Sequence, residues 1–238
     1  MGAKQARSQY LLFLNPDAEL GADTLKNVFY FMEEEANSAI GICGVQLLDE
    51  ESRVARSCAR FPSVSGFAAH SIGLDKLFPR FGHRMSEWDH VCDRRVDQVI
   101  GAFFFVRRSI FEKLDGFDER FFVYFEEVDF SYRASLEGWF SAFLGTSKAY
   151  HSGGGTSNQV KAKRLFYSLR SRILYSFKHF SFFGASSVLF VTIFFEPISR
   201  SLLAVIRKSR AGLKETWYGY SMLWSWLSKW IFSRGTRG

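Results

Sequence analysis

Tyr10-Leu11-Leu12-Phe13-Leu14-Asn15-Pro16-Asp17 is the stretch that decides the fold. Its first five residues form a short apolar run, which is typical of a buried strand in a parallel sheet. Asn15-Pro16-Asp17 ends the run, because proline cannot donate a ladder hydrogen bond and Asn and Asp favour turns. The stretch therefore predicts a central parallel strand with a loop at its carboxyl end, the edge of an open α/β sheet where ligands bind.

The segments after this loop alternate between helical and strand patterns. A helix is predicted over residues 22–35 and a strand over 40–48, which would close a βαβ-like unit with the first strand. Apolar residues at helical spacing predict the inner face of that helix: Leu25, Val28, Phe29 and Met32. Long loops and one or two short helices are expected over residues 49–97.

A second group of elements is predicted in the next part of the chain. They are a strand over 99–106, a short helix over 108–114, a helix with Val128, Tyr132 and Leu136 on one face that ends at Gly138, and a strand over 140–144. Together with the first group they predict an α/β fold, a Rossmann-like sheet with flanking helices.

The positive charge lies in the last third of the chain. Residues 1–158 carry a net charge of −5 and residues 159–238 a net charge of +12. A basic, aromatic helix is predicted over 165–180, followed by an uncharged run over 180–195. That run is shorter than the roughly 20 residues of a membrane span and ends at Glu196-Pro197, so a re-entrant or interfacial segment fits as well as a span.

The final predicted helix, over residues 217–232, suits a membrane surface. Its expected apolar face carries Trp217, Tyr220, Trp224, Leu227 and Ile231. Basic residues beside long apolar runs favour anionic lipid headgroups over nucleic acid, and no nucleic-acid-binding motif is recognised. We therefore expect a membrane surface as a partner and no nucleic acid.

The cysteines and the first residues indicate the compartment. Cys43, Cys58 and Cys92 are an odd number without metal-ligand spacing, so neither a disulfide framework nor a zinc site is expected. No apolar signal core follows Met1, so a signal peptide is not predicted. A reducing cytoplasm fits both observations.

Three places in the sequence carry groups suited to chemistry. Asp17 is either a ligand at a strand end or a helix cap within an Asn-Pro-Asp turn. Glu126 and Glu127 begin a helix beside aromatic residues, where burial can raise the pKa of one carboxylate to suit a general base, although acidic residues in a first helical turn also simply stabilise the dipole. His151 precedes the glycines of 153–155, which either close over a phosphate group or form a linker.

The order of these motifs resembles the GT-A family 2 glycosyltransferases, in particular their bacterial rhamnosyltransferase-like branch. The resemblance runs from Tyr10 to about His179 and rests on Asn15-Pro16-Asp17, Gly101-Ala102, Gly116-Phe117-Asp118-Glu119, the acidic stretch 121–129 and Tyr150-His151. It implies a partial GT-A domain over residues 1–158, followed by a basic, membrane-associated helical region over 159–238.

The resemblance also assigns roles to individual residues. Asn15 and Asp17 would lie at the donor site, with Mg²⁺ or Mn²⁺ held by Asp17 and His151. Glu127 would be the general base, with Glu126 as the alternative. The acceptor side is predicted from four residues: Gly101, Ala102, Asp118 and Asp129. Asp129 also has a structural explanation, because Arg133 lies four residues later and can pair with it.

The implied reaction is inverting transfer of a sugar, with L-rhamnose as the candidate, from a nucleotide-diphosphate sugar to a lipid-linked or cell-surface glycan. Such enzymes serve cell-wall polysaccharide or lipopolysaccharide O-antigen biosynthesis at the cytoplasmic face of the bacterial inner membrane. The family's nucleotide-binding strands would precede Tyr10. The alternative is therefore a catalytically inactive fragment or one half of a split enzyme, in which the first strand's edge pairs with a separate N-terminal half or with a second copy.

Overall fold

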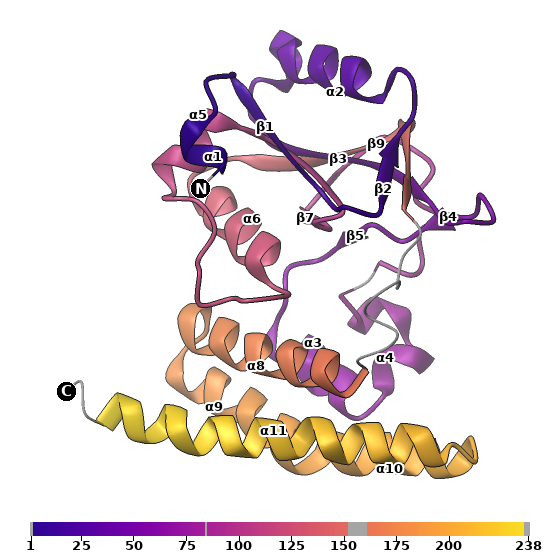
Figure 1. The fold of residues 1–238 in the computed structure, drawn as a ribbon, viewed down its shortest axis with the longest axis vertical. Coiled ribbons are helices and arrows are strands. Elements are labelled where there is room, and N and C mark those ends of the chain that lie inside the picture. Colours follow the sequence, from indigo (N-terminus) through magenta and orange to yellow (C-terminus); the bar gives the residue numbers. More distant parts are fainter. Residues whose placement is uncertain (1, 84, 152–160, 236–238) are drawn as a thin grey trace. The chain divides into compact units, whose positions relative to one another are not determined.

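The structure, a computed structural model, describes residues 2–83, 85–151 and 161–235. The chain forms two compact units (Figure 1). Unit 1 comprises Met1–Pro62, Gly82–Glu119 and Glu126–Gly155, and unit 2 comprises Ser63–Phe81, Arg120–Phe125 and Thr156–Gly238. Two short internal segments therefore cluster with the C-terminal helices.

Unit 1 is built on a mixed sheet in the order β1-β8-β3-β9-β2 (Figure 1). The bounds are β1 Tyr10–Leu14, β2 Ala18–Leu20, β3 Ile40–Leu48, β8 Phe103–Arg107 and β9 Phe140–His151. β3 and β9 are parallel, and the other neighbours on this path are antiparallel. Short strands complete the unit: β4 (Val54–Ala55) on β3, β6 (Arg94–Val96) on β9, and a separate pair of β5 (Cys58–Ala59) with β7 (Gln98–Val99).

The expected place of the first strand was wrong. β1 lies at the edge of the described sheet and runs antiparallel to β8, which separates β1 from β3. The segment β1–α2–β3 is therefore not a unit of adjacent parallel strands. An apolar run predicts burial but not which strand will lie beside it or in which direction, so the prediction of a central parallel strand failed. Pairing of the outer edge of β1 with another chain stays a prediction.

Two other strand boundaries also differ from expectation. The strand predicted over 99–106 is divided into β7 and β8 by a turn at residues 100–102. The strand predicted over 140–144 continues to His151 as β9. Both differences matter for the site, because Gly101 lies in the turn and His151 is the last residue of the longer strand.

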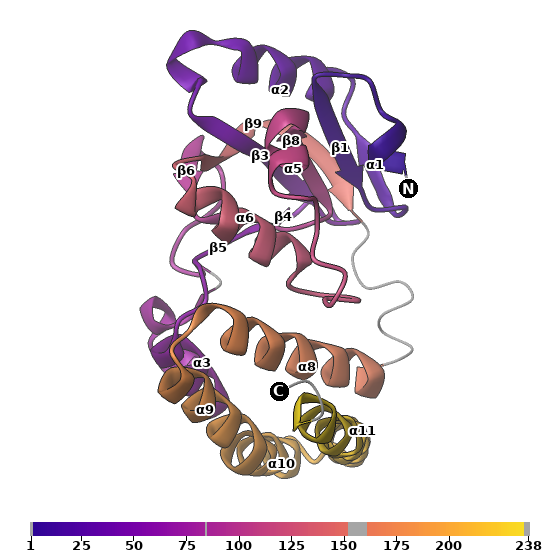
Figure 2. The same ribbon diagram turned by 90° about the vertical axis from the view of Figure 1, so that its left-hand side faces the viewer.

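Helices cover both faces of the sheet (Figures 1 and 2). α2 (Thr24–Glu33) packs on one face, where Val28 and Met32 are buried against Phe103 and Phe105. The other face carries α5 (Arg108–Lys113) and α6 (Glu126–Leu136), with Ile110 and Phe130 buried against Phe104 and Val106. Alternate residues of β8 thus serve opposite cores, as the two-residue period of a strand requires.

The predicted α/β sheet with flanking helices is confirmed, but the helical faces are only partly as expected. Leu25 and Phe29 of α2 are 45% and 41% exposed, and Leu136 of α6 is 69% exposed. Periodicity places a residue on a face of the helix but does not show how far the neighbouring strands extend beneath it. The shorter helices of unit 1 are α1 (Gly2–Gln5) and the 3₁₀ turn η1 (Glu35–Asn37).

Unit 2 is helical (Figure 2). Its long helices are α8 (Lys161–His179), α9 (Phe182–Phe190), the π-helical turn η3 (Val191–Phe195), α10 (Glu196–Ile206) and α11 (Arg210–Gly235). The shorter elements are α3 (Val64–Ser71), α4 (Leu74–Leu77) and η2 (Pro79–Phe81). Leu169 and Ile173 of α8 pack with Tyr220 and Leu223 of α11 in a common core.

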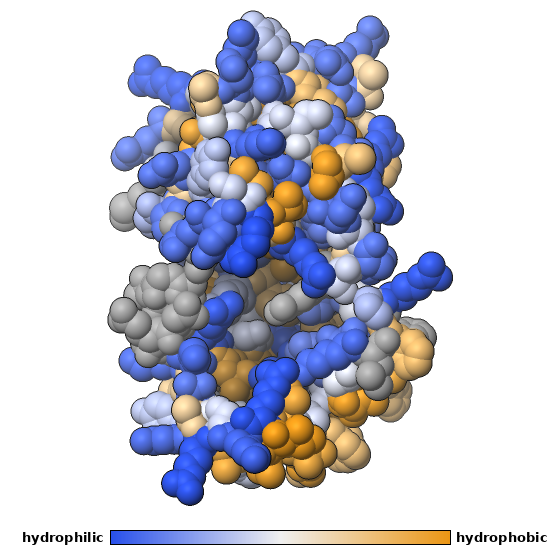
Figure 3. All heavy atoms as spheres, turned by 90° about the vertical axis from the view of Figure 1, so that its right-hand side faces the viewer, coloured by the Kyte–Doolittle hydropathy of each residue, from blue (hydrophilic) through white to orange (hydrophobic). Residues whose placement is uncertain are grey.

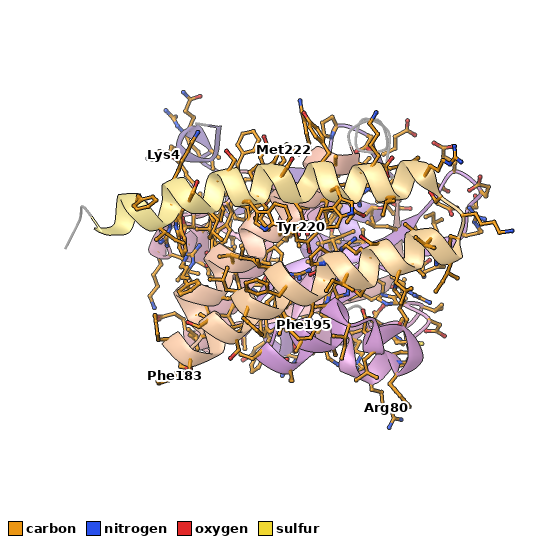
Figure 4. All side chains as sticks on the ribbon, turned by 90° about the horizontal axis from the view of Figure 1, so that it is seen from below. Lys4, Arg80, Phe183, Phe195, Tyr220 and Met222 are labelled. Atoms are coloured by element: carbon orange, nitrogen blue, oxygen red, sulfur yellow. The ribbon has the colours of Figure 1, made fainter. Side chains whose placement is uncertain are left out.

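The expected apolar face of the last helix was therefore wrong in part. Tyr220 and Leu227 are buried within unit 2, whereas Trp217, Trp224 and Ile231 are exposed. In Figure 4, α10 and α11 run side by side, with Tyr220 between them and Phe183 projecting outward. One helical segment among those described, Phe182–Ile206, is long and apolar enough to cross a membrane by length and composition.

A buried ion cluster centred on Glu196 of this segment connects three helices of unit 2. Glu196 of α10 is 1% exposed and contacts Arg172 of α8 and Arg200 of α10, the latter at 2.7 Å from Oε1. Ser71 of α3 donates a hydrogen bond to Oε2 of Glu196 at 3.1 Å. The carboxylate is therefore removed from water but matched by two guanidinium groups.

Arg172→Ala is expected to destabilise the protein by about 3–5 kcal/mol, because it leaves the buried Glu196 charge undercompensated. Denaturant unfolding of the purified chain measures the change. Lys163→Ala, at an exposed position of the same helix, is the control and should shift stability by less than about 0.5 kcal/mol. Equal stabilities of the two variants would show that the cluster does not hold α8 and α10 together.

Candidate functional site

β2 brings Asp17 and His151 together. This short strand begins directly after Asp17, and Ala18 pairs with His151 at the end of β9. The His151 Nε2 atom lies 3.3 Å from Asp17 Oδ1, and the Asn15 side-chain nitrogen lies 3.3 Å from the same Nε2. The Asp17 side chain is 43% exposed and that of His151 17% exposed, so the pair opens to solvent.

The donor set at this pair fits a divalent cation that also binds phosphate oxygens. A carboxylate oxygen and an imidazole nitrogen are suitable ligands for Mn²⁺, and Mg²⁺ in phosphate sites often takes only one or two carboxylates from the protein. Within residues 2–83, 85–151 and 161–235, no group of three His, Cys, Asp or Glu residues is arranged to hold a metal. Asp17 and His151 could supply two of the ligands of such an ion.

The predicted glycine loop of residues 153–155 lies outside the described residues. His151 itself was expected in a loop after a strand, and it is the last residue of β9 instead. The position in the ladder fixes its backbone, so the imidazole is held beside Asp17 by sheet pairing.

Glu126 and Glu127 begin α6 and form the second part of the site. The Oε2 atom of each is buried and has no hydrogen-bond partner among the described residues. Burial, helped by the negative charge of the neighbouring Glu126 carboxylate, raises the pKa of Glu127 to about 7, although backbone N–H groups including that of Gly101 oppose the rise. Burial also raises the pKa of Glu126. Near neutral pH Glu127 can therefore accept or release a proton.

The turn at residues 100–102 joins the two parts. The backbone N–H of Asn15 donates to the Ala102 carbonyl at 3.1 Å, next to Gly101, whose N–H faces the Glu127 carboxylate. A Cβ at Gly101 would lie 4.0 Å from the Glu127 carboxyl carbon. Gly101 and Ala102 were predicted for the acceptor side, and the structure places them between the Asn15 loop and the acidic pair.

The backbone before the acidic pair is strained. Tyr124 and Phe125 have φ angles of 65° and 74°, the left-handed region that bulky residues seldom adopt. Two such residues in succession cost roughly 1–3 kcal/mol each and are typical of functional sites. They reverse the chain immediately before Glu126, and the sequence showed no glycine or asparagine here that would have predicted this turn.

Asp129, which was predicted for the acceptor side, pairs with Arg133 of the same helix. Its side chain is fully buried, and the Arg133 Nε atom donates to its Oδ2 at 2.8 Å. Arg133 also donates to the carbonyls of Leu114 and Gly116 at 2.6 and 2.7 Å. Asp129 therefore has a structural role, because its ion pair fixes the turn before the acidic stretch to α6. Asp118 lies in that turn region and is partly exposed.

The raised pKa of Glu127 predicts how the free energy of unfolding changes with pH. A Glu in the unfolded chain titrates near 4.3, so between that pH and about 7 the folded state binds more protons and loses stability as the pH rises. Glu127→Gln is expected to be more stable than wild type by about 1–3 kcal/mol at pH 8 and nearly equal to it at pH 4.5. Urea unfolding at both pH values measures the difference.

The control for this experiment is Glu50→Gln, at an exposed position in a loop. It should give the same difference from wild type at both pH values. If Glu127→Gln behaved like Glu50→Gln, the Glu127 carboxylate would be solvated and the proposed burial would be wrong.

Comparison with known proteins identifies relatives. No protein-family model matches the chain. Over 175 residues it is 27% identical to the rhamnosyltransferase WbbL of Escherichia coli K12, a match that covers 72% of this chain and 63% of that protein. Over 160 residues it is 26% identical to N-acetylglucosaminyl-diphospho-decaprenol L-rhamnosyltransferase of Mycobacterium tuberculosis, covering 66% of this chain and 51% of that protein.

Among solved structures, the mannosyltransferase PcManGT from Pyrobaculum calidifontis, in complex with GDP-Man and Mn²⁺, matches with a TM-score of 0.48 and 12% identity. That match covers 92% of this chain and 62% of the other. The sequence relatives are glycosyltransferases, and the chain is homologous to this class of enzyme. The two relatives described above are named as rhamnosyltransferases, so the predicted resemblance to the rhamnosyltransferase-like branch is confirmed. The chain spans between about half and two thirds of the length of these relatives.

Proposed function

We propose that the chain carries a metal-dependent glycosyltransferase site that moves a sugar, with L-rhamnose as the first candidate, from a nucleotide diphosphate to a lipid-linked glycan. One observation carries the proposal. Asp17 and His151 lie together, and the turn at Gly101 and Ala102 links them to Glu127, whose carboxylate is buried and has a raised pKa. The names of the sequence relatives support the sugar and the kind of acceptor.

The donor half of the site would be formed by Asn15, Asp17 and His151. Asp17 and His151 would hold Mg²⁺ or Mn²⁺. The bound ion would neutralise the negative charge that develops on a leaving diphosphate. Asn15, fixed by its backbone bond to Ala102, places its side chain beside His151 at the donor site. The exposure of Asp17 leaves room for the oxygens of a nucleotide diphosphate.

The acceptor half would use Glu127 as the general base. In the step we propose, Glu127 takes the proton from an acceptor hydroxyl while that oxygen forms a bond to the anomeric carbon of the donor. The bond from that carbon to the diphosphate oxygen breaks, and the nucleotide diphosphate leaves with the electron pair. Direct displacement of this kind inverts the anomeric configuration. A pKa near 7 suits the role, because the base is then partly ionised yet basic at neutral pH.

Unit 2 would attach the protein to the cytoplasmic face of the inner membrane. Its exposed apolar residues gather on α9, η3, α10 and α11, including Phe183, Phe194, Ile198, Leu202, Ile206, Trp217 and Phe232. They accompany the +12 net charge of residues 159–238. The buried Glu196 cluster favours attachment along a surface over a span, because a spanning helix would carry these charges into hydrocarbon.

Transfer from a panel of nucleotide sugars to a lipid-linked N-acetylglucosaminyl diphosphate, with and without Mn²⁺, tests the proposed function. Metal-dependent formation of a disaccharide-lipid product is the expected result. The purified chain should also float with anionic vesicles and less with zwitterionic ones. A folded sample that binds no nucleotide diphosphate under any metal condition would contradict the proposal.

A further inference from the structure

Unit 2 contains a cavity of about 270 Å³ at the turn between α10 and α11. Its lining comes from the start of α8, the end of α10 and the start of α11: Lys161, Leu165, Arg200, Leu203, Ala204, Arg207, Ser209, Gly212, Glu215 and Thr216. The volume is slightly below the range of about 300–1,000 Å³ for drug-sized ligands. It therefore suits a small group, such as a headgroup, better than a whole substrate.

The charges around this cavity favour an anion. Three cationic side chains line it against the single carboxylate of Glu215. Arg200 is already bonded to Glu196, whereas Lys161 and Arg207 are exposed and have no ion-pair partner among the residues that the structure describes. Two cations are therefore available for a ligand, one from α8 and one from the residue that follows α10.

The backbone adds to this preference. Lys208 has a φ of 51°, which ends α10 in a tight left-handed turn. Ser209 then caps α11 by accepting a hydrogen bond from the Gly212 N–H at 3.0 Å, so the positive end of a 26-residue helix meets the cavity. The helix end supports the two cations and would not by itself define a site.

Exposed apolar side chains neighbour the lining residues of this cavity in the sequence of α10 and α11. On α10, Leu202, Val205 and Ile206 are 59%, 62% and 68% exposed, next to the lining residues Leu203, Ala204 and Arg207. On α11, Trp217 and Tyr218 are exposed directly after Thr216. Figure 3 looks from the side on which α10 turns into α11 and shows hydrophilic side chains beside hydrophobic ones on this unit.

We propose that this cavity binds the diphosphate of an acceptor lipid, with Lys161 and Arg207 contacting the phosphate oxygens and the apolar chain lying along the exposed residues of α10 and α11. The inference rests on the proposed function, because it names the lipid part of that reaction's acceptor. A diphosphate carried on a long apolar chain matches both the cations of the cavity and the exposed apolar residues of α10 and α11. A free anion would use only the cations, and an uncharged lipid only the apolar residues.

Farnesyl diphosphate, a short soluble isoprenoid diphosphate, is the probe for this site. Calorimetric titration of the detergent-solubilised chain is expected to show at least about 10-fold tighter binding of farnesyl diphosphate than of farnesol or inorganic diphosphate. Lys161→Ala combined with Arg207→Ala should weaken farnesyl diphosphate binding by about 10- to 100-fold, because two charge-assisted hydrogen bonds are lost. Both residues are exposed, so thermal unfolding should be unchanged.

Lys229→Ala, an exposed cation elsewhere on α11, is the matched control and should bind like wild type. Unchanged affinity in the double variant would overturn the proposal. Equal affinity for inorganic diphosphate and farnesyl diphosphate would also overturn it, because it would indicate a site for free anions. Anionic phospholipid vesicles that compete as well as farnesyl diphosphate would overturn it too, because they would indicate a general headgroup site. Nucleotide binding is measured on the same samples: its absence with intact farnesyl diphosphate binding rejects the proposed function and leaves the lipid site standing.

Discussion

Glu127→Gln is expected to lower the rate of sugar transfer by about 10²- to 10⁴-fold, the usual contribution of a general base. Glutamine keeps the shape of the side chain but cannot take a proton from an acceptor hydroxyl. The buried Oε2 of Glu127 and its pKa of about 7 single it out from the surface carboxylates of unit 1. Initial rates with saturating donor and Mn²⁺ measure the loss.

The neighbouring residue provides the sharpest control. Glu126→Gln removes a negative charge beside Glu127, so it should lower the pKa of Glu127 and move the rising limb of the pH–rate profile to lower pH while much of the maximal rate remains. A larger loss in Glu126→Gln than in Glu127→Gln would assign the base to Glu126. In wild type the rate should rise with pH through about 7, because only the ionised carboxylate can act as a base.

Asp17→Ala is expected to remove the metal dependence of donor binding. With Mn²⁺ present, the affinity for dTDP or UDP should fall by about 100-fold, which corresponds to about 3 kcal/mol and is reasonable for the loss of a metal bridging protein and diphosphate. Without metal, wild type and variant should bind the nucleotide equally weakly. Calorimetric titration with each nucleotide, with and without Mn²⁺, measures both quantities.

Two variants separate the metal role from a general charge effect. Glu19→Ala removes an exposed carboxylate two residues away on β2 and should leave nucleotide binding unchanged. His151→Ala removes the second proposed ligand and should reproduce the Asp17→Ala result, since the two side chains are 3.3 Å apart. If Asp17→Ala kept full Mn²⁺-dependent affinity, Asp17 would be only part of the turn, the structural alternative that the sequence left open.

Much of the local structure followed from the sequence. The strand over Ile40–Leu48 and the helix within residues 22–35 were predicted closely, because long apolar and periodic patterns reflect burial by neighbours of any kind. The ion pair between Asp129 and Arg133 also follows from spacing alone, since residues four apart share a helical face. The class of enzyme was predicted from ordered motifs and agrees with the sequence relatives.

The sequence by itself determined which residues are chemically capable: a carboxylate after a strand, an acidic pair at a helix start, and one histidine before a glycine run. Only the tertiary structure decided that these groups belong to one site. Antiparallel pairing of β2 with β9 places His151 beside Asp17, 134 residues away in sequence, and the turn at Gly101 and Ala102 joins that pair to Glu127. Strand pairing is a long-range choice made by the whole sheet, so no local pattern encodes it, whereas the chemistry of each side chain is fixed by its residue type.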